Sequence, residues 1–339
     1  MSVKDHRKTL LKSLILIFIC AALVSAPACS SSGSKFSVTY TDLFDTVTEF
    51  TAYCSSVSKF NEVSDALQAE LLRLHRLFDI YNEYDGITNL AYLNRTCGDS
   101  PQKAGKEIIE LIDLGLIYCE KTDGKMNIFA GAVTSVWHKY RQSGSGIPTD
   151  EELKEAAKHI FAQSVKLDNG TVYFTDKDLK IDVGATAKGY ASQIASQMIK
   201  SMGVNDFALN IGGNVVVSGQ KPDGLWKIGV QDPGGDGLYT KVKVSDISVV
   251  TSGDYQRCYE YNGKKYHHII DLITLYPAEN YSSVTVICKD AAAADALSTA
   301  LFLVSVEEGE ALLKQYDAEA LWIKSDGTPV RTAGFSAYE

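Results

Sequence analysis

Asp295 and Thr299 could bind a metal ion together. They stand four residues apart in the apolar segment 291–304, whose composition predicts a helix, and residues at that spacing share one helix face. A carboxylate and a hydroxyl, joined by a nearby backbone carbonyl, offer the hard oxygen ligands that suit Mg²⁺. The alternative is a polar pair that satisfies hydrogen bonds within a packed core, and this segment alone does not decide between the two.

The segment 181–190 combines two glycines with a lysine, in the order IDVGATAKGY. We expect a strand, a loop and the start of a helix here. Glycines allow close backbone approach, a helix N-terminus favours anions, and Lys188 could contact a phosphate. The segment is not a Walker A motif, because the first glycine and the Lys-Ser/Thr ending are missing. A plain strand-to-helix connection is the alternative.

Two further segments carry groups that could contact a ligand. In a strand over 265–270, His268 and Ile270 would face one side, and His267 and Ile269 the other. A histidine beside a cleft could act as a general base or contact a phosphate, or it could be structural. The segment 210–214 runs from a buried strand into a Gly-Gly turn, which marks either close backbone packing or a ligand cradle.

The spacing of apolar residues predicts the elements that position these groups. Helices are expected over residues 61–79, 106–122, 151–159, 190–202, 291–304 and 307–315. A strand pair is expected over residues 36–54, and a hairpin over 165–167 and 171–174 around the turn 168–170. Further strands are expected over residues 180–183, 207–211, 215–218, 226–231, 239–250, 255–261, 265–270, 283–288, 321–324 and 330–332, with a linker over 142–149. Strands in runs, with helices interspersed but no regular alternation, predict an α+β fold.

Charge and cysteine content exclude several classes of protein. The net charge of −9 becomes about −12 once the basic N-terminal segment is set aside, which argues against a nucleic-acid-binding protein. The cysteines beyond residue 29 are odd in number and show no C-x-x-C spacing, so we expect free thiols and neither a disulfide framework nor a structural zinc site. They are Cys54, Cys97, Cys119, Cys258 and Cys288.

The N-terminus has the pattern of an export signal. Basic residues precede an apolar stretch from Leu14 to Val24, followed by the small residues 25–28 and Cys29. The apolar stretch is too short to span a membrane. Because Cys29 and the Ser/Gly-rich residues after it resemble a bacterial lipobox and tether, we expect a signal peptide over 1–28, a lipidated Cys29 with a flexible tether over 29–35, and a domain over 36–339. Simple secretion is the alternative.

Five segments together resemble the ApbE family of exported FAD:protein FMN transferases, which are often lipoproteins. They are 182–190, 210–214, 251–255 (TSGDY), 268–271 (HIID) and 294–300 (ADALSTA), and they occur in the order and spacing of that family. The resemblance extends from about residue 44 to residue 330. It implies a single ApbE-like, T-fold-related domain with mixed or antiparallel sheets and flanking helices.

The resemblance also implies a reaction and a site. FAD would be the substrate, bound with Mg²⁺, and its FMN part would pass to a Thr or Ser hydroxyl of an exported or membrane-bound redox protein, with release of AMP. Asp295, Thr299 and the backbone carbonyls of Ala185 and Ser298 would bind the metal. FAD would contact Tyr81, Lys125, Met126, Asn127, Asp182, Lys188 and Ile269. His268 would be the base that activates the incoming hydroxyl.

The chain departs from the family pattern at three places. Phe44-Asp45-Thr46 stands where Met-Gly-Thr is usual, and Met126-Asn127 where Phe-Asp is common. The segment 272–277 reads LITLYP where Pro-x-Thr-Gly-Tyr-Pro is usual, and the loss of a proline and a glycine should reshape that turn. Two other functions stay open: FAD pyrophosphatase, in which water replaces the hydroxyl, and a flavin-binding lipoprotein without turnover.

Overall fold

The computed structural model describes residues 33–339, and its largest element is one antiparallel sheet. In spatial order its strands are β1 (Ser34–Leu43), β2 (Thr46–Cys54), β6 (Phe207–Ile211), β7 (Asn214–Ser218), β10 (Ile247–Gly253), β13 (Tyr281–Cys288), β14 (Glu319–Lys324) and β15 (Pro329–Arg331). All neighbours in this sheet pair antiparallel. The predicted α+β class is therefore confirmed.

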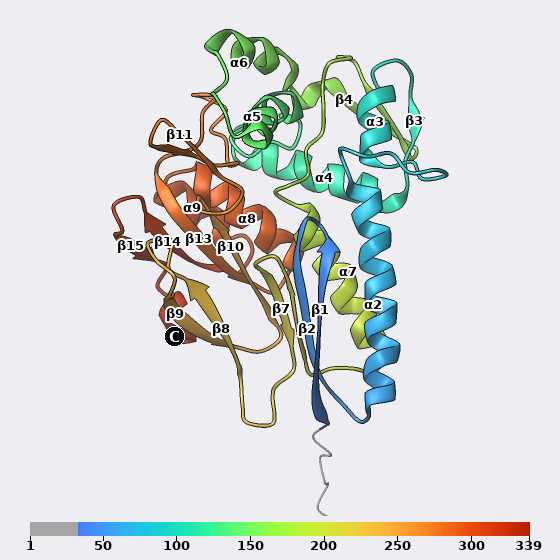
Figure 1. Ribbon diagram of the computed structural model, residues 1–339, viewed down its shortest axis with the longest axis vertical. Helices are drawn as coiled ribbons and strands as arrows, with labels where there is room; N and C mark the ends of the chain where they lie inside the picture. Colours follow the sequence, from blue (N-terminus) through green and yellow to red (C-terminus); the bar gives the residue numbers. More distant parts are fainter. Residues whose placement is uncertain (1–32) are drawn as a thin grey trace, which may run out of the picture. The chain divides into compact units, whose positions relative to one another are not determined.

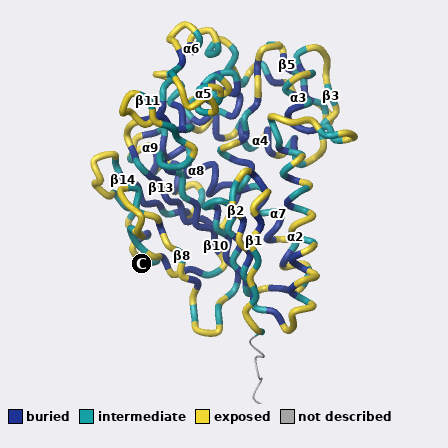
Figure 2. Tube along the Cα trace, in the orientation of Figure 1, coloured by how far each residue is buried: buried dark blue, intermediate teal, exposed yellow. Residues whose placement is uncertain are grey.

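Helices cover one face of this sheet and enclose the main core (Figures 1 and 2). They are α2 (Val57–Phe78), α7 (Ala187–Ser201), α8 (Ala291–Leu303) and α9 (Val306–Leu313). In α2 the buried residues Val63, Leu67, Leu71 and Leu74 recur at helical spacing, so one stripe faces the sheet. Helix α8 is apolar around nearly its whole circumference and is buried accordingly, which places Asp295 inside the protein.

Two elements cover the opposite face of the sheet. One is the hairpin of β8 (Trp226–Gln231) and β9 (Leu238–Val244), and the other is the 3₁₀ segment η3 (Phe335–Tyr338) near the C-terminus. Alternate residues of the hairpin, among them Val230 and Val242, are buried against the sheet. The central strands of the large sheet are therefore covered on both faces, and the loops at the strand ends can form a site.

A smaller group of elements lies beyond one end of the sheet (Figure 1). Its helices are α3 (Leu90–Thr96), α4 (Lys106–Lys121), α5 (Gly131–Ser143) and α6 (Asp150–Ala156), followed by the 3₁₀ segments η1 (Ala157–His159) and η2 (Ala162–Ser164). Its strands are β3 (Gln102–Lys103), β4 (Val165–Asp168), β5 (Thr171–Phe174), β11 (Tyr259–Tyr261) and β12 (Lys264–Tyr266). Trp137 of α5 stacks on Tyr266 of β12, and this contact joins the two parts of the group.

Three sequence predictions are corrected by the structure. Helix α7 begins at Ala187 and not at residue 190, so Lys188 and Gly189 belong to its first turn. Residues 180–183 form no strand; Lys180 makes only a single bridge to Ala130. The strand expected over 265–270 ends at Tyr266, because the chain leaves the hairpin there. Helix α5 was not predicted at all, since glycine and hydroxyl residues mask its apolar spacing.

The N-terminal predictions fall largely outside the described residues. The signal peptide over 1–28, Cys29 and most of the tether are not among them, and β1 begins at Ser34, within the predicted tether. Within residues 33–339, no helix is both long and apolar enough to cross a membrane. The five cysteines in this part of the chain are free thiols, as predicted.

Two residues that stand where the family pattern has glycine adopt left-handed conformations that favour glycine. Leu275, at the position of the usual glycine, has φ +66°, and Asp45 has φ +52°. The turn around Leu275 is held by a hydrogen bond from its N–H to the Asp271 carbonyl at 2.7 Å and by one from Trp137 Nε1 to the Leu275 carbonyl at 2.9 Å. Tertiary contacts therefore stabilise a backbone that the residue type disfavours.

Gly189 allows α7 and α8 to cross at close range. A Cβ added to Gly189 would lie 2.5 Å from the Ala291 carbonyl oxygen and closer still to Asp295 Cβ. We therefore expect Gly189→Ala to lower the free energy of unfolding by about 1–3 kcal/mol, because the helices must separate to admit the methyl group. Chemical denaturation with urea measures the effect.

Gly235→Ala is the matched control, since Gly235 has no atom within 4 Å of its added Cβ and no left-handed φ. This control should be neutral or slightly stabilising, because alanine restricts the unfolded chain. Equal stability of the Gly189 variant and the wild type would contradict the close crossing.

Candidate functional site

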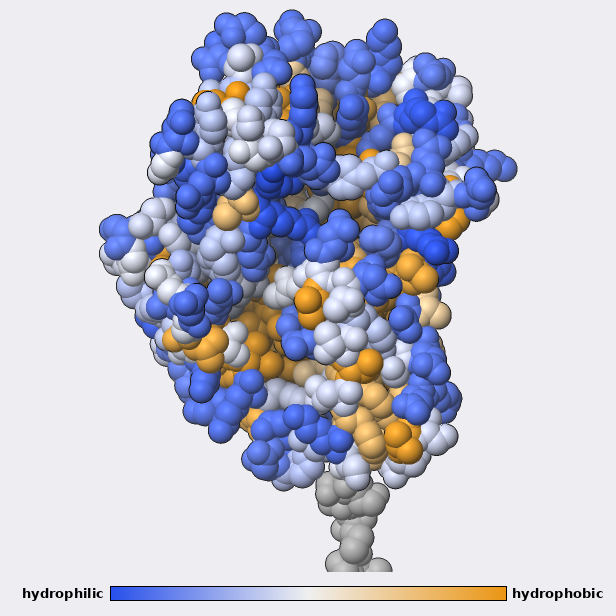
Figure 3. All heavy atoms as spheres, in the orientation of Figure 1, coloured by the Kyte–Doolittle hydropathy of each residue, from blue (hydrophilic) through white to orange (hydrophobic). Residues whose placement is uncertain are grey.

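A cavity lies where the loops before α5, after β10 and after β12 meet α8. Figure 3 shows a hollow on this face of the molecule, with mostly hydrophilic residues around it. The cavity is lined by Tyr81, Lys125, Met126, Asn127, Ile128, Ala130, Thr134, Trp137, His138, Arg141, Asp182, Gly184, Ala185, Arg257, His268, Ile269, Ile270, Leu272, Thr299 and Leu303. The structure thus brings residues from most of the predicted motifs to one place.

Asp295 is the buried carboxylate beside this cavity, with a residue exposure of 2%. Its Oδ2 accepts a hydrogen bond from the Gly189 N–H at 2.7 Å. That N–H belongs to the first turn of α7, where backbone donors have no partner within the helix. The positive end of the α7 dipole therefore stabilises the buried charge.

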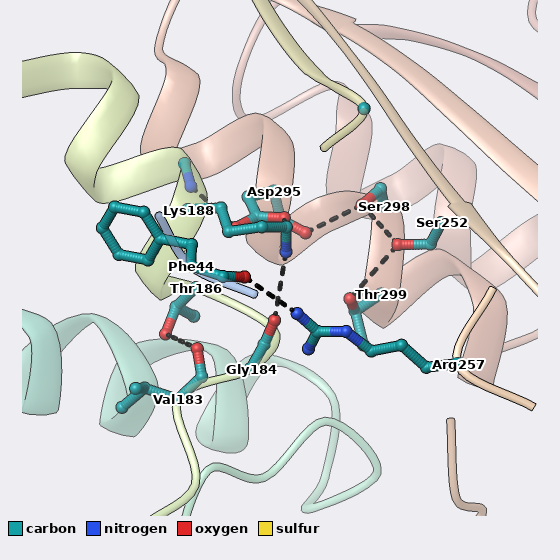
Figure 4. A network of polar contacts seen from close by, with 12 residues as sticks. Phe44, Val183, Gly184, Thr186, Lys188, Ser252, Arg257, Asp295, Ser298 and Thr299 are labelled. Carbon is teal, nitrogen blue, oxygen red and sulfur yellow. Dashed lines mark hydrogen bonds and ion pairs between the residues drawn. The ribbon is translucent and has the colours of Figure 1, made fainter. Parts of the chain in front are cut away.

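Lys188 lies among oxygen atoms at the same place (Figure 4). Its Nζ is 3.7 Å from Asp295 Oδ1 and 3.3 Å from the Gly184 carbonyl oxygen. Oδ1 itself accepts no hydrogen bond from residues 33–339. The carboxylate and the carbonyl thus form a position that attracts positive charge, in which the lysine ammonium now lies.

Ser298 and Thr299 extend this position along α8 (Figure 4). The Ser298 hydroxyl donates to the Asp295 carbonyl at 2.9 Å and is 2.8 Å from the Ser252 hydroxyl oxygen. The Ser298 side chain is therefore committed to internal hydrogen bonds. Thr299 is less buried, lines the cavity, and its Oγ1 has only a 3.4 Å contact with Ser252. Its lone pairs are the ones available to a ligand.

The donor set fits a hard divalent cation. Asp295 Oδ1, Thr299 Oγ1 and the carbonyls of the Gly184–Ala185 loop are all oxygens, as Mg²⁺ prefers. Asp295 Oδ1 and the Gly184 carbonyl flank the Lys188 ammonium, and Ala185 and Thr299 line the adjoining cavity. A different group, His159 with Asp176 and Asp178, also brings three ligand atoms close together. None of its residues lines the cavity.

Within the described part of the chain, Asp182 is the only acidic residue that lines this cavity. Its Oδ2 accepts a hydrogen bond from the Thr134 hydroxyl at 2.6 Å, and its Oδ1 accepts one from the Gly184 N–H at 2.9 Å. Both oxygens are thus used to fix the loop that carries Ala185, so the loop shape is set before any ligand binds.

His268 reaches the cavity as a neutral side chain. Burial, together with the positive charges of Arg257 and Lys188, lowers the pKa of His268 to about 3. Its Nδ1 lies 3.2 Å from the Gln256 carbonyl, which can only accept, so the proton is assigned to Nδ1 and Nε2 keeps its lone pair. This is the protonation state that a general base requires.

The neighbouring His267 has a structural role. Its Nε2 is 2.8 Å from the Ala278 carbonyl, and its Nδ1 accepts from the Ile269 N–H at 3.2 Å. The strand alternation expected for these residues is wrong, because His268, Ile269 and Ile270 all line the cavity. The cause is the bend in the chain directly after Tyr266.

The predicted FAD-contacting residues other than Lys188 also line the cavity. Tyr81 stacks on His138 with ring centroids 4.6 Å apart, and burial with the nearby Asp182 charge raises the pKa of Tyr81 to about 12. Lys125 pairs with Glu308 at 2.8 Å. Lys188 lines a second cavity, which shares Tyr81, Asp182, Gly184 and Arg257 with the first.

Sequence reasoning missed the contribution of α5 and of the loop after β10. Thr134, His138 and Arg141 of α5 line the cavity, as does Arg257. The helical spacing of Val133, Val136 and Trp137 was the signal that could have revealed α5. Arg257 follows the 251–255 motif by two residues, and no pattern distinguished it from an ordinary surface arginine.

Comparisons with known proteins identify the family of this chain. The ApbE family model matches residues 33–322. A curated FAD:protein FMN transferase of Treponema pallidum is 32% identical over 265 residues, covering 72% of this chain and 73% of the relative. One of Klebsiella pneumoniae is 29% identical, with 73% and 81% covered.

Solved structures of other proteins share the fold of this chain. A Thermotoga maritima ApbE protein superimposes with a TM-score of 0.82 at 27% identity, covering 90% of this chain and 99% of that one. The flavin transferase ApbE of Vibrio cholerae gives 0.79 at 20% identity, with the same coverage, and shows the fold alone. With a match over most of its length and a curated relative above 30% identity, the chain belongs to the ApbE family.

Proposed function

We propose that this protein transfers the FMN part of FAD to a Ser or Thr hydroxyl of other proteins and releases AMP. The observation that carries the proposal is the convergence, in a chain of the ApbE family, of Asp295, Thr299, Lys188 and neutral His268 around two joined cavities. An oxygen donor set for a cation, a lysine and a base are the groups that a phosphoryl transfer from a dinucleotide needs.

The chemistry proceeds by one displacement at phosphorus. The acceptor hydroxyl oxygen forms a bond to the FMN phosphorus, the phosphoanhydride bond breaks, and AMP leaves with the bridging oxygen and its electron pair. His268 Nε2 takes the hydroxyl proton. Asp295, Thr299 and the Ala185 carbonyl would hold Mg²⁺, which offsets charge on the phosphates when bound. Lys188 can turn from Asp295 toward a phosphate, and Asp182 keeps the Gly184–Ala185 loop in place.

The direct test uses the domain from residue 34 onward with FAD, Mg²⁺ and a partner protein that carries a flavinylation site. Covalent flavin fluorescence on a denaturing gel, with one AMP released per labelled partner, is the expected result. AMP and free FMN without labelled partner would indicate a pyrophosphatase. Bound FAD without AMP would indicate a flavin-binding protein, and either outcome would replace the proposal.

Asp295→Asn should reduce Mg²⁺-dependent transfer by roughly 100-fold or more, because changes even to groups behind a metal ligand cost 10–100-fold. Asparagine keeps an oxygen that can accept the Gly189 hydrogen bond, so the fold should persist. Initial rates over a Mg²⁺ titration measure the effect.

Asp290→Asn on the same helix is the control for that variant. Asp290 is the N-cap of α8, and asparagine caps equally well, so activity should stay at the wild-type level. Unchanged Mg²⁺ dependence in the Asp295 variant would show that the cation lies elsewhere.

His268→Gln should lower kcat by about 100-fold or more, the usual contribution of a positioned base, while FAD affinity changes little. Single-turnover transfer and FAD binding, measured on the same preparation, separate the two. Equal losses in both would assign His268 to binding.

The pH dependence of the wild type follows from the lowered pKa of His268. Since the free protein keeps His268 neutral well below pH 6.5, kcat/KM for FAD should show no step near pH 6.5. Activity that depends on neutral His268 should fall only as the pH approaches the lowered pKa. A step near 6.5 that disappears in His268→Gln would mean that His268 titrates as an ordinary exposed histidine.

We also propose that the protein is exported and held at the outer side of the cell membrane by a lipid on Cys29. The N-terminal pattern supports this, and a short spacer to β1 would keep the transferase near membrane-bound acceptors. Cys29→Ser should move the protein from the membrane fraction to the soluble exported fraction. An unchanged distribution would rule out the lipid anchor.

A further inference from the structure

Two arginines face the first cavity without an acidic partner. Within residues 33–339, no carboxylate oxygen lies within 4.0 Å of the guanidinium of Arg141 or Arg257. Arg141 donates to His138 Nδ1 at 2.9 Å, and Arg257 donates to the Phe44 carbonyl at 3.3 Å. A guanidinium carries five N–H groups, so most donors of both side chains remain available.

Carboxylates are abundant in this chain, which has 42 acidic residues against 33 basic ones. Three arginines of the described chain pair with them: Arg73 with Glu70 and Glu107, Arg95 with Glu83, and Arg331 with Glu339. Arg76 forms no ion pair but lies over the Tyr84 ring. Arg141 and Arg257 differ from all of these because they face a cavity with most of their donors available.

The two guanidinium groups lie close enough for each charge to influence the same neighbouring side chains. Burial lowers the pKa of Arg141, and the nearby Arg257 charge lowers it further. Both arginines also contribute to the lowered pKa of His268. Among the described residues, Asp182 is the only carboxylate in the wall of the first cavity, and it already accepts hydrogen bonds on both oxygens. Asp45 and Asp79 line the second cavity together with Arg257 but lie beyond the 4.0 Å of an ion pair with it. Two like charges are thus held near each other without a paired counter-charge.

Arg257 also occupies a particular position. It lines both cavities, and Figure 4 shows its guanidinium near Gly184 and Thr299, opposite Lys188 and Asp295. Its φ of +43° is unfavourable for a residue with a side chain, and such strain persists where the surrounding structure imposes it, commonly at functional sites. Arg141 lines only the first cavity, beside the stacked Tyr81 and His138.

We propose that Arg141 and Arg257 clamp the pyrophosphate of FAD, with Arg257 on the phosphate nearer to Asp295 and Thr299. This rests on the proposed function for the identity of the ligand. The two phosphates carry two negative charges, which matches the two unpaired guanidiniums, and planar guanidinium groups bind phosphate oxygens through paired hydrogen bonds. The clamp stabilises charge on the AMP phosphate as the phosphoanhydride bond breaks.

The test compares two ligands in the absence of acceptor and Mg²⁺, so that no turnover is needed. Flavin fluorescence gives the affinity of FAD, which carries the pyrophosphate, and of riboflavin, which does not. Arg141→Gln and Arg257→Gln should each weaken FAD binding about 10–100-fold, as expected for hydrogen bonds to charged groups. Riboflavin affinity should change less than threefold, and inorganic pyrophosphate should displace FAD from the wild type at lower concentration than from either variant.

Matched variants keep the result interpretable. Arg331→Gln removes an arginine that lines neither cavity and should leave both affinities unchanged. Arg141→Lys and Arg257→Lys keep the charge but lose the paired hydrogen bonds, so they should recover part of the lost FAD affinity. Thermal unfolding confirms that each variant folds, and a lysine variant replaces any glutamine variant that does not.

Two outcomes would overturn the clamp. Equal losses of FAD and riboflavin affinity would mean that the arginines support the flavin ring or the fold. Unchanged FAD affinity with a raised KM for the acceptor protein would mean that they bind acidic groups of the acceptor. Because binding is measured without transfer, the clamp can hold even if the wild type proves to be a pyrophosphatase, and it can fail while transfer is observed.

Discussion

The hydrogen bond between the Gly189 N–H and Asp295 Oδ2 is the interaction on which the rest of the site depends. A carboxylate as buried as Asp295 is costly unless it is hydrogen-bonded and near positive charge, and the first turn of α7 supplies both. Only glycine lets the two helices approach closely enough for this bond. The same contact therefore fixes the packing of α7 on α8 and directs Oδ1 toward Lys188. The close approach of α7 and α8 at Gly189 is thus required both by the helix packing and by the site.

A second consequence concerns charge. The chain is acidic overall, yet Lys188, Arg141 and Arg257 line its two adjoining cavities near a neutral His268. Burial is the main cause of the lowered pKa of His268, and the positive charges of Arg257, Lys188 and Arg141 lower it further. An anionic ligand that enters this region reverses the sign of the local field and raises the pKa of His268. Binding of a phosphate-bearing substrate thus strengthens the base that its reaction needs.

The sequence predicted the parts of the site that lie on regular elements. Asp295 and Thr299 share one face of α8 because helical periodicity alone requires it, and the hairpin around Asn169 and Gly170 follows from turn chemistry. The rest depends on tertiary contacts. The prediction that His268 and Ile269 face opposite sides of a strand was wrong because the chain bends after Tyr266. Arg141 was not predicted as a site residue because α5 has few apolar residues and was not recognised as a helix. Whether an arginine has an acidic partner depends on which residues the fold brings near it, so the spacing of residues along the chain cannot predict it.

The departures from the family pattern show how the site tolerates sequence change. Asp45 and Leu275 keep left-handed backbones that glycine would adopt without strain, at a cost on the order of 1–3 kcal/mol each. Trp137 holds the Leu275 carbonyl, and His75 Nδ1 accepts from the Phe44 N–H at 3.0 Å, so neighbouring side chains impose the path. The backbone near the donor atoms is thus maintained, whereas Asp45 and Leu272 add new side chains to the cavity walls. Such changes alter what the rim presents to an incoming protein, and they leave the oxygen donors of α8 untouched.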